Sequence, residues 1–356
     1  MYKLLASIAL PITEEEYRND GCLHYSTLAK YERGGFSAIP TLKDKVDTSS
    51  TQYGQLVDTL LTGASGEFEK KFFVVDFVKP KPAHCIVTKA LFDRYHADYS
   101  SIDKIPDADI LAVAAETEFN KHWSDTTRLN AIRRECSEYY KLLQIAETKT
   151  IIDTETYQQG LAAVKALKES PATKWYFETD NPFDDSIERL YQGKFRATID
   201  GLEYSCMADL IVCDHKNKVI YPCDLKTSSH KEYEFFQSFV EFSYWIQAGE
   251  YAAILKANLE KDEYFKDFKI MPYRFIVINK ENLDPRVWEW KYTFSDTNIT
   301  ITDTDITITY KSGYKKILRN FRTIGKELHS YLETGQKVPD GITNEPNDIK
   351  EWLEKS

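Results

Sequence analysis

The chain has no run of eighteen apolar residues and no pair of cysteines at CxxC spacing. The first absence excludes a membrane-spanning helix, which needs about 20 consecutive apolar residues. The six cysteines stand singly, and Cys206, Cys213 and Cys223 lie in β-prone stretches, where buried free thiols are ordinary. This usage favours a reducing cytoplasm over a disulfide scaffold. The chain also lacks an internal repeat and a low-complexity linker.

Positive charge is in deficit, because 46 lysines and arginines stand against 56 aspartates and glutamates, a formal net charge of −10. This balance does not by itself suggest a DNA-binding protein, but net charge says little about local charge. Hydrophobic residues make up 42% of the chain and aromatic residues 13%, enough for one large domain or two small ones. We expect one domain over 1–356, with a mostly helical insertion or subdomain at 64–180, a core at 194–294, and a β-hairpin and C-terminal helix at 296–356.

The periodicity of the second half predicts an α/β fold with a mixed sheet flanked by helices. Asp200-Gly201 and the polar stretch 214–218 are turn signals that link three β-prone runs into a meander from 194 to 227. We expect the first 63 residues to add helices before this sheet. The later elements expected are a long helix over roughly 232–257, strands at 273–280 and 287–294, a hairpin at 299–309 and a helix over about 313–333.

Two acidic residues mark the strands on either side of the turn at 214–218. Asp209 interrupts an apolar run, Asp224 ends the next run, and Lys226 follows two residues later. Pairing the strands brings both carboxylates and the lysine to one end of a sheet, where two carboxylates bind a hard divalent cation through oxygen. A neighbouring ammonium positions water or stabilises charge on a phosphate. The competing interpretation is a strand-edge aspartate facing water and a surface ion pair.

The order of Asp209, a hairpin, Asp224-Leu225-Lys226 and then Gln247-Ala248-Gly249-Glu250-Tyr251 resembles the PD-(D/E)XK nuclease superfamily. Within its RecB-like branch the chain looks most like the exonuclease VIII (RecE-like) phage recombination exonucleases. The resemblance implies that Asp209, Asp224 and the backbone carbonyl of Leu225 ligate a metal, and that Lys226 orients or activates the attacking water. It also implies that Gln247 and Tyr251 position this lysine or touch DNA; the alternative is that they only pack their helix on the sheet.

Further patches resemble the same family, namely 11–17, 25–28, 53–61, 273–280, 285–288 and 335–341. In the patch 53–61 the family has a helix G-x-x-x-H-x-L-L whose histidine ligates the metal, and this chain has Asp58 there. Aspartate is also an oxygen donor, so a Mg²⁺ or Mn²⁺ site remains compatible with it; a solvated helix residue is the alternative. Iron–sulfur members of the branch cluster cysteines after the Q-x-x-x-Y helix, whereas no cysteine follows Cys223. No iron–sulfur cluster is therefore expected.

Four basic residues recur at i, i+4, i+7 and i+11 in the last expected helix: Lys315, Arg319, Arg322 and Lys326. Apolar residues follow the same spacing on the opposite face, so this helix is predicted to be amphipathic. A basic stripe of this kind suits contacts with DNA phosphates. The competing interpretation is an ordinary solvated face.

The resemblance implies a Mg²⁺- or Mn²⁺-dependent deoxyribonuclease that digests linear double-stranded DNA from its ends, 5′ to 3′, in phage or prophage recombination. It further implies a homo-oligomer, a single-strand annealing protein as partner and the cytoplasm of a bacterial host as location. Two alternatives stay open: another RecB-like nuclease, endonucleolytic or of opposite polarity, and an inactive DNA-binding recombination scaffold. Asp58 in place of histidine favours the scaffold, and the intact Asp-Leu-Lys core argues against it.

Overall fold

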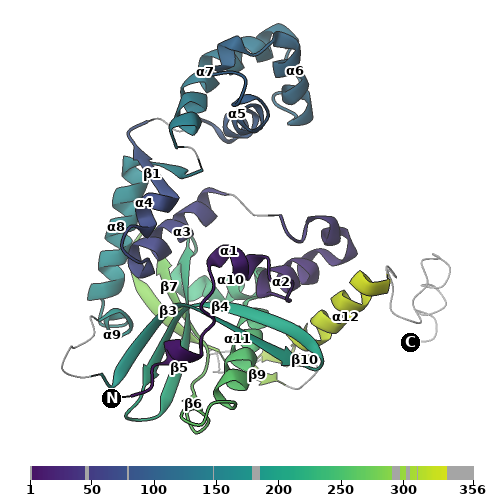
Figure 1. Ribbon diagram of the computed structural model, residues 1–356. Helices are drawn as coiled ribbons and strands as arrows, with labels where there is room; N and C mark the ends of the chain where they lie inside the picture. The colour runs from purple at the N-terminus through teal and green to yellow at the C-terminus, as the bar shows by residue number, and fades with distance from the viewer. Residues whose placement is uncertain are drawn as a thin grey trace, which may run out of the picture. The chain divides into compact units, whose positions relative to one another are not determined.

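The computed structural model describes residues 2–44, 48–77, 80–146, 148–178, 185–290, 297–301, 305–310 and 312–334. Contacts divide the chain into two compact units (Figure 1), which are described separately below. Unit 1 combines Met1–Thr48 with Lys165–Ser356, and unit 2 is Ser49–Val164.

Unit 1 is built on a mixed six-stranded sheet, which confirms the predicted α/β class. The strands are β3 (Ile187–Ile199), β4 (Leu202–Asp214), β5 (Val219–Ser228), β7 (Arg274–Asn279) and β8 (Pro285–Glu289) in that order, with β6 (Lys269–Ile270) paired to β5. The predicted meander is confirmed, since β3, β4 and β5 run antiparallel. Its first turn holds Asp200 and Gly201 at φ of 52° and 83°, the conformation that favours Asp-Gly in a tight hairpin. β7 lies parallel to β5, so the chain crosses over between them.

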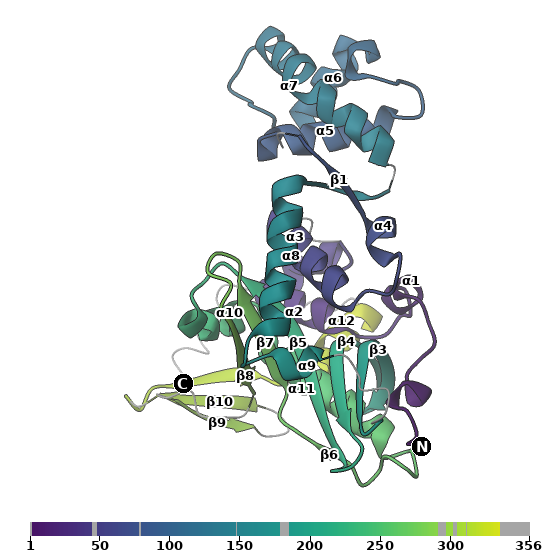
Figure 2. The ribbon, with the colours of Figure 1, turned by 90° about the vertical axis from the view of Figure 1, so that its left-hand side faces the viewer.

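The crossover from β5 to β7 consists of η4 (Glu232–Glu234), α10 (Phe235–Glu241) and α11 (Tyr244–Leu259). The single helix expected over 232–257 is wrong, because the chain breaks at Phe242 and Ser243. Ser243 takes a left-handed φ of 60° and is 2% exposed, so burial maintains a conformation that serine seldom adopts. Both faces of α11 carry buried residues, and it packs against β3 and β4 (Figure 2).

A second, three-stranded sheet follows, formed by β9 (Thr297–Ile301), β10 (Asp305–Tyr310) and β11 (Lys315–Arg319). The hairpin expected at 299–309 is confirmed by the antiparallel pairing of β9 and β10. The helix expected over about 313–333 is wrong in its first part, because Lys315–Arg319 pair antiparallel with β10. Asn320 ends the strand and caps α12 (Phe321–Thr334), since its Oδ1 accepts from the amide of Arg322 at 3.1 Å.

The N-terminal part of unit 1 is helical, as predicted: η1 (Leu5–Ile8), α1 (Glu14–Arg18), α2 (Tyr25–Gly34) and η2 (Gly35–Thr41). α1 begins with a capping box in which Thr13 and Glu16 satisfy each other's backbone amides. Lys174–Phe177 form the short helix α9. One apolar core joins α2 and the sheet to α10, α11 and α12.

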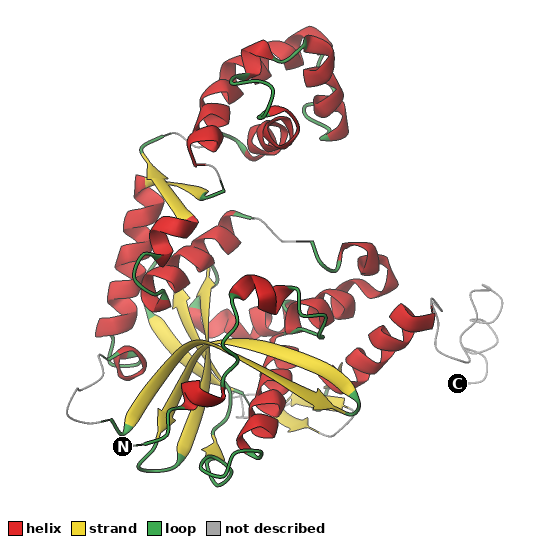
Figure 3. Cartoon of the chain, in the orientation of Figure 1, coloured by secondary structure: helices red, strands yellow, loops and turns green. Residues whose placement is uncertain are grey.

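Unit 2 is mostly helical, with one short parallel pair of strands (Figure 3). Its elements are α3 (Ser49–Thr62), α4 (Glu67–Lys71), β1 (Phe72–Val75), α5 (Pro82–Tyr95), η3 (Ile102–Lys104), α6 (Asp107–Glu116), α7 (Asp125–Ala146), β2 (Thr150–Asp153) and α8 (Thr154–Glu169), which leads back to unit 1. Its main core lies between α5, α6 and α7.

None of the described helices combines the length and apolar character that crossing a bilayer requires.

Candidate functional site

Strands β4 and β5 part from each other midway along their length. They pair from Asp214 with Val219 as far as Leu210 with Cys223, and the ladder ends there. β5 nevertheless continues to Ser228 beside β7. The two strands therefore form a fork, and Asp209 and Asp224 are the first residues beyond the last pair. We call Asp209, Asp224 and Lys226 the β4–β5 fork.

The fork brings the predicted acidic residues into contact through the backbone. The amide of Leu225 donates to Asp209 Oδ2 at 2.9 Å, so a carboxylate takes the place of a strand carbonyl. Asp224 is 2% exposed, and its Oδ2 lies 2.5 Å from Lys226 Nζ. Its Oδ1 accepts from Gln247 Nε2 at 2.5 Å. A buried carboxylate is stable only when it is paired and hydrogen-bonded. In Asp224, Oδ2 is ion-paired with Lys226 and Oδ1 is hydrogen-bonded by Gln247.

Lys226 is held between a carboxylate and an aromatic ring. Its Nζ lies 4.7 Å from the ring centroid of Tyr244, the first residue of α11. Burial alone would lower the pKa of Lys226, but the negative charge of Asp224 keeps this pKa above its ordinary value. Lys226 is therefore a cation at neutral pH, suited to offsetting negative charge.

Helix α11 supplies a second layer of buried polar groups behind the fork. Gln247 is 4% exposed and Tyr251 is 7% exposed, so both predicted residues point inward. Of these two residues, Gln247 donates a hydrogen bond to the fork, whereas the Tyr251 ring packs on Tyr273, with centroids 6.0 Å apart. Burial, and next the charges of Asp224 and Asp209, raise the pKa of Tyr273 well above its usual range. Gln247 Oε1 and Tyr273 Oη are buried without a hydrogen-bond partner in the described part of the chain.

Sequence reasoning missed Tyr25, Tyr244 and Tyr273 as neighbours of the fork. Tyr244 stands three residues before Gln247, a spacing that places both on one face of a helix. Tyr273 is the first residue of the strand expected at 273–280. A strand prediction does not say which neighbours the ring of its first residue contacts. Tyr25 comes from a distant part of the sequence, and only the tertiary fold brings it near Lys226.

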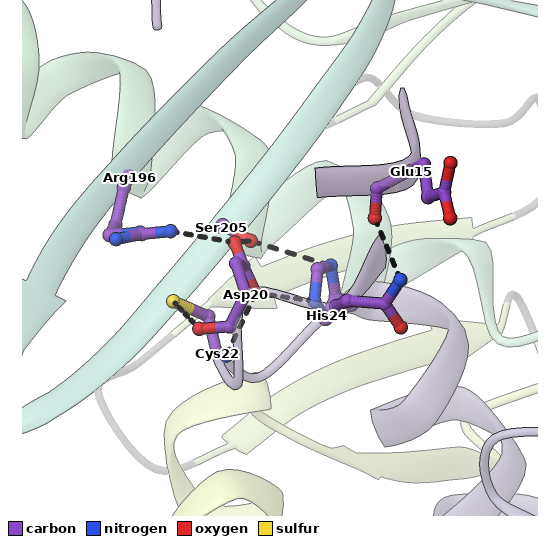
Figure 4. Close-up of polar contacts among 7 residues, drawn as sticks. Glu15, Asp20, Cys22, His24, Arg196 and Ser205 are labelled. Carbon is purple, nitrogen blue, oxygen red and sulfur yellow. Dashed lines mark hydrogen bonds and ion pairs between the residues drawn. The ribbon is translucent and has the colours of Figure 1, made fainter. Parts of the chain in front are cut away.

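The N-terminal segment lies along the edge of β4 that β5 leaves. Leu23 forms a parallel bridge with Tyr204, and the amide of Ser205 donates to the Leu23 carbonyl at 3.0 Å. Asp20 fixes this arrangement (Figure 4): its Oδ2 accepts from Ser205 Oγ at 2.7 Å and its Oδ1 lies 3.0 Å from His24 Nε2. Although burial opposes it, the hydrogen bonds from Ser205 and from the amide of Cys22, followed by the charge of His24, hold the pKa of Asp20 below its ordinary value. The network positions the start of α2, and with it Tyr25.

Asp58 belongs to unit 2, where it lies on α3 and its Oδ1 is 3.1 Å from Thr62 Oγ1. Its role as a metal ligand in place of histidine stays a prediction.

The expectation that the four basic residues lie along one helix is wrong. Lys315 and Arg319 lie on β11, whereas Arg322 and Lys326 lie on α12. Arg319 Nη2 lies 2.5 Å from Glu32 and its Nη1 lies 2.6 Å from Glu327. These two carboxylates hold the end of β11 against α2 and α12.

The two helical members of the predicted stripe share one partner. Arg322 and Lys326 both pair with Asp200, at 2.8 and 3.0 Å, so they fasten α12 to the β3–β4 turn. Contact of these basic residues with DNA stays a prediction.

No protein-family model and no curated protein matches this chain. Function is therefore inferred from the residues of the fork.

Proposed function

We propose that the chain is a metal-dependent deoxyribonuclease whose active site is the β4–β5 fork. The observation that carries this proposal is the convergence of Asp209, Asp224 and Lys226 where two strands part. A phosphodiester hydrolase needs carboxylates for a divalent cation and a positive charge near the phosphate. These three side chains provide both.

The donor set fits Mg²⁺ or Mn²⁺, which prefer carboxylate and carbonyl oxygens. Each carboxylate oxygen has two acceptor sites, so the hydrogen bonds from Leu225 and Gln247 leave acceptor capacity on Asp209 and Asp224. We assign these carboxylates, with the Leu225 carbonyl, as the ligands. The bound cation would supply Lewis acidity and a more acidic water. Gln247 holds the Asp224 carboxylate in place.

Lys226 has a separate role in this proposal. Its ammonium group offsets the negative charge that develops on the phosphate during attack. The Tyr244 ring lies beside Nζ and limits the positions that the lysine takes. Replacing Lys226 by methionine keeps an unbranched side chain, one atom shorter, and removes the charge, so it separates this role from packing.

Within the proposed function, the resemblance to RecE-like exonucleases favours digestion of linear duplex ends from 5′ to 3′. It also favours a homo-oligomer that hands its single-stranded product to an annealing protein in a bacterial cytoplasm. A covalently closed circular duplex separates this activity from an endonuclease, because an exonuclease leaves the circle intact. An inactive scaffold would bind DNA and cleave neither substrate.

The first test is digestion of one linear duplex labelled at its 5′ or 3′ ends, with Mg²⁺, Mn²⁺ or EDTA. Asp224→Asn keeps the shape of the side chain and removes its charge. Asp284→Asn is the matched control, since that aspartate is 41% exposed and pairs with Arg286 at the surface. We expect metal-dependent loss from 5′ ends with the wild type and the control, and none with Asp224→Asn. Equal digestion by all three proteins would place the activity elsewhere or in a contaminant.

A further inference from the structure

A second group of metal-binding side chains lies at the other end of β4. Cys213 is near the C-terminal end of that strand, His215 follows in the turn, and Glu188 faces Cys213 from β3. Cys213 is fully buried and His215 is 3% exposed. Glu188, Cys213 and His215 each offer a ligand atom, and these atoms lie within 4.8 Å of one another. Tyr264, from the segment after α11, reaches the same histidine.

The hydrogen bonds of Glu188 define which nitrogen of His215 carries the proton. Glu188 Oε2 accepts from the amide of Leu5 at 2.6 Å and lies 3.1 Å from His215 Nε2. Its Oε1 accepts from the amide of Ala6 at 3.0 Å. A carboxylate only accepts, so Nε2 of the histidine is the donor and Nδ1 of the neutral ring keeps its lone pair. Orientation of an imidazole by a carboxylate behind it is the usual arrangement at histidine metal ligands.

Two groups approach that single lone pair. Cys213 Sγ lies 3.6 Å from Nδ1, and Tyr264 Oη lies 3.3 Å from it. One lone pair accepts one good hydrogen bond, so the thiol and the hydroxyl compete for it. Around a tetrahedral Zn²⁺, ligand bonds of about 2.3 Å to sulfur and about 2.0–2.1 Å to nitrogen or oxygen separate the ligand atoms by roughly 3.6 Å (S and N) and 3.3 Å (N and O). The two observed separations match these values.

We propose that Cys213 Sγ and His215 Nδ1, with Tyr264 Oη beside them, form a binding site for a thiophilic divalent cation of the zinc class. Glu188 is the positioning residue that fixes the histidine ring. Thiolate and imidazole select zinc over magnesium, whereas the carboxylates of the β4–β5 fork have the opposite preference. Cys213 is four residues beyond Asp209, about 13 Å along the strand at about 3.3 Å per residue. The two sites are therefore separate.

The cation would join three segments that meet at this end of the sheet. Glu188 already ties the N-terminal turn to β3 through Leu5 and Ala6, and the Tyr2 ring stacks on His215 with centroids 4.9 Å apart. Tyr264 belongs to the connection that leads to β6. An ion that binds only the folded chain stabilises it in proportion to its affinity and concentration. The site would thus fasten the N-terminal segment, whose later part pairs with β4 at Leu23.

The test is a Zn²⁺ titration of the metal-free full chain against a chromophoric chelator, with a large excess of Mg²⁺ present to occupy oxygen sites. We expect one tightly bound Zn²⁺ in the wild type. Cys213→Ser and His215→Asn should lose this binding, and Glu188→Gln should weaken it about 10–100-fold. Cys85→Ser is the matched control, because that thiol lies in unit 2 and should leave the affinity unchanged. Circular dichroism establishes that each variant is folded.

Cobalt(II) provides a readout on the wild type alone, so the test does not depend on a variant that folds. A Co²⁺ ion bound to Cys213 should show thiolate-to-metal charge transfer and the intense visible bands of tetrahedral coordination, and Zn²⁺ should abolish both. Absence of the charge-transfer band would overturn the proposal. Unchanged Zn²⁺ affinity in Cys213→Ser and His215→Asn would overturn it as well. Nuclease activity is not measured in either experiment, so failure here leaves the proposed function standing.

Discussion

Replacing Glu250 by glutamine should remove a pH dependence from the stability of the protein. Glu250 lies in the middle of α11 and is fully buried, and both carboxylate oxygens lack a hydrogen-bond partner among the described residues. The groups around it are Tyr17 on α1, Tyr204 and Cys206 on β4, and Tyr251 on its own helix. All four are neutral near pH 7, so burial raises the pKa of Glu250 well above 4.5.

The sign of the effect follows from proton binding. Above about pH 4.5 the unfolded chain releases the Glu250 proton and the folded chain keeps it, so stability falls as the pH rises. The slope from one such group is about 1.4 kcal/mol per pH unit above about pH 4.5. It ends at the folded-state pKa. Glutamine has nearly the shape of the protonated acid and no proton to lose. The variant should therefore gain stability relative to the wild type as the pH rises.

The assay is unfolding by urea at a series of pH values above about 4.5. Tryptophan fluorescence monitors the unfolding, and Trp245 on the same helix is one of the fluorophores. Subtracting the wild-type free energy of unfolding from that of Glu250→Gln cancels the other titrating groups. Glu260→Gln is the matched control, because that residue caps the same helix in solvent and pairs with Lys256 at 3.6 Å. A difference that stays constant with pH for Glu250→Gln would refute the reasoning, since Glu250 would then titrate alike in both states.

Three further changes have defined expected outcomes, each measured by chemical unfolding. Gln247→Leu removes the donor to buried Asp224 and should cost about 1.5–3 kcal/mol, whereas an unchanged stability would mean that the hydrogen bond is not formed. Gly325→Ala places a Cβ 2.2 Å from Tyr204 Oη and should cost about 1–3 kcal/mol. Tyr204→Phe in the same chain should recover part of this loss, because it removes the nearest atom. Asn320→Ala deletes the α12 cap and should cost about 1 kcal/mol; no change would show that the cap is dispensable.

The sequence predicted the meander and the meeting of its acidic residues because both depend on local signals. Polar turns at 200–201 and 214–218 define the hairpins, and the alternation of side chains puts Asp224 and Lys226 on one face of β5. Gln247 was assigned by its place in a motif, and the structure shows what it contacts. These inferences needed no knowledge of how distant segments pack.

The errors arose where tertiary contacts override a local pattern. Neither glycine nor proline marks the break at Ser243, whose left-handed backbone is maintained by burial. The stretch 315–319 fits a helical period, yet its backbone groups pair with β10, so strand formation prevails. The place of Leu23 beside β4 was not predictable either, because it depends on a contact across about 180 residues of sequence.

Because Asp209 accepts a structural hydrogen bond at the fork, a test of its role in metal binding needs a substitution that keeps this bond. Where β4 and β5 part, their backbone groups lose ladder partners, and buried amides have to be satisfied by other acceptors. Leu23 serves one stretch of β4, and the Asp209 carboxylate serves the amide of Leu225. Alanine at Asp209 would therefore remove both a proposed metal ligand and a structural acceptor, so loss of activity in that variant would have two explanations. Asparagine retains an oxygen for the Leu225 amide while it removes the charge. If Asp209→Asn unfolds like the wild type but no longer responds to Mg²⁺, the carboxylate acts through the cation; if its stability collapses, the charge is needed to hold the fork itself.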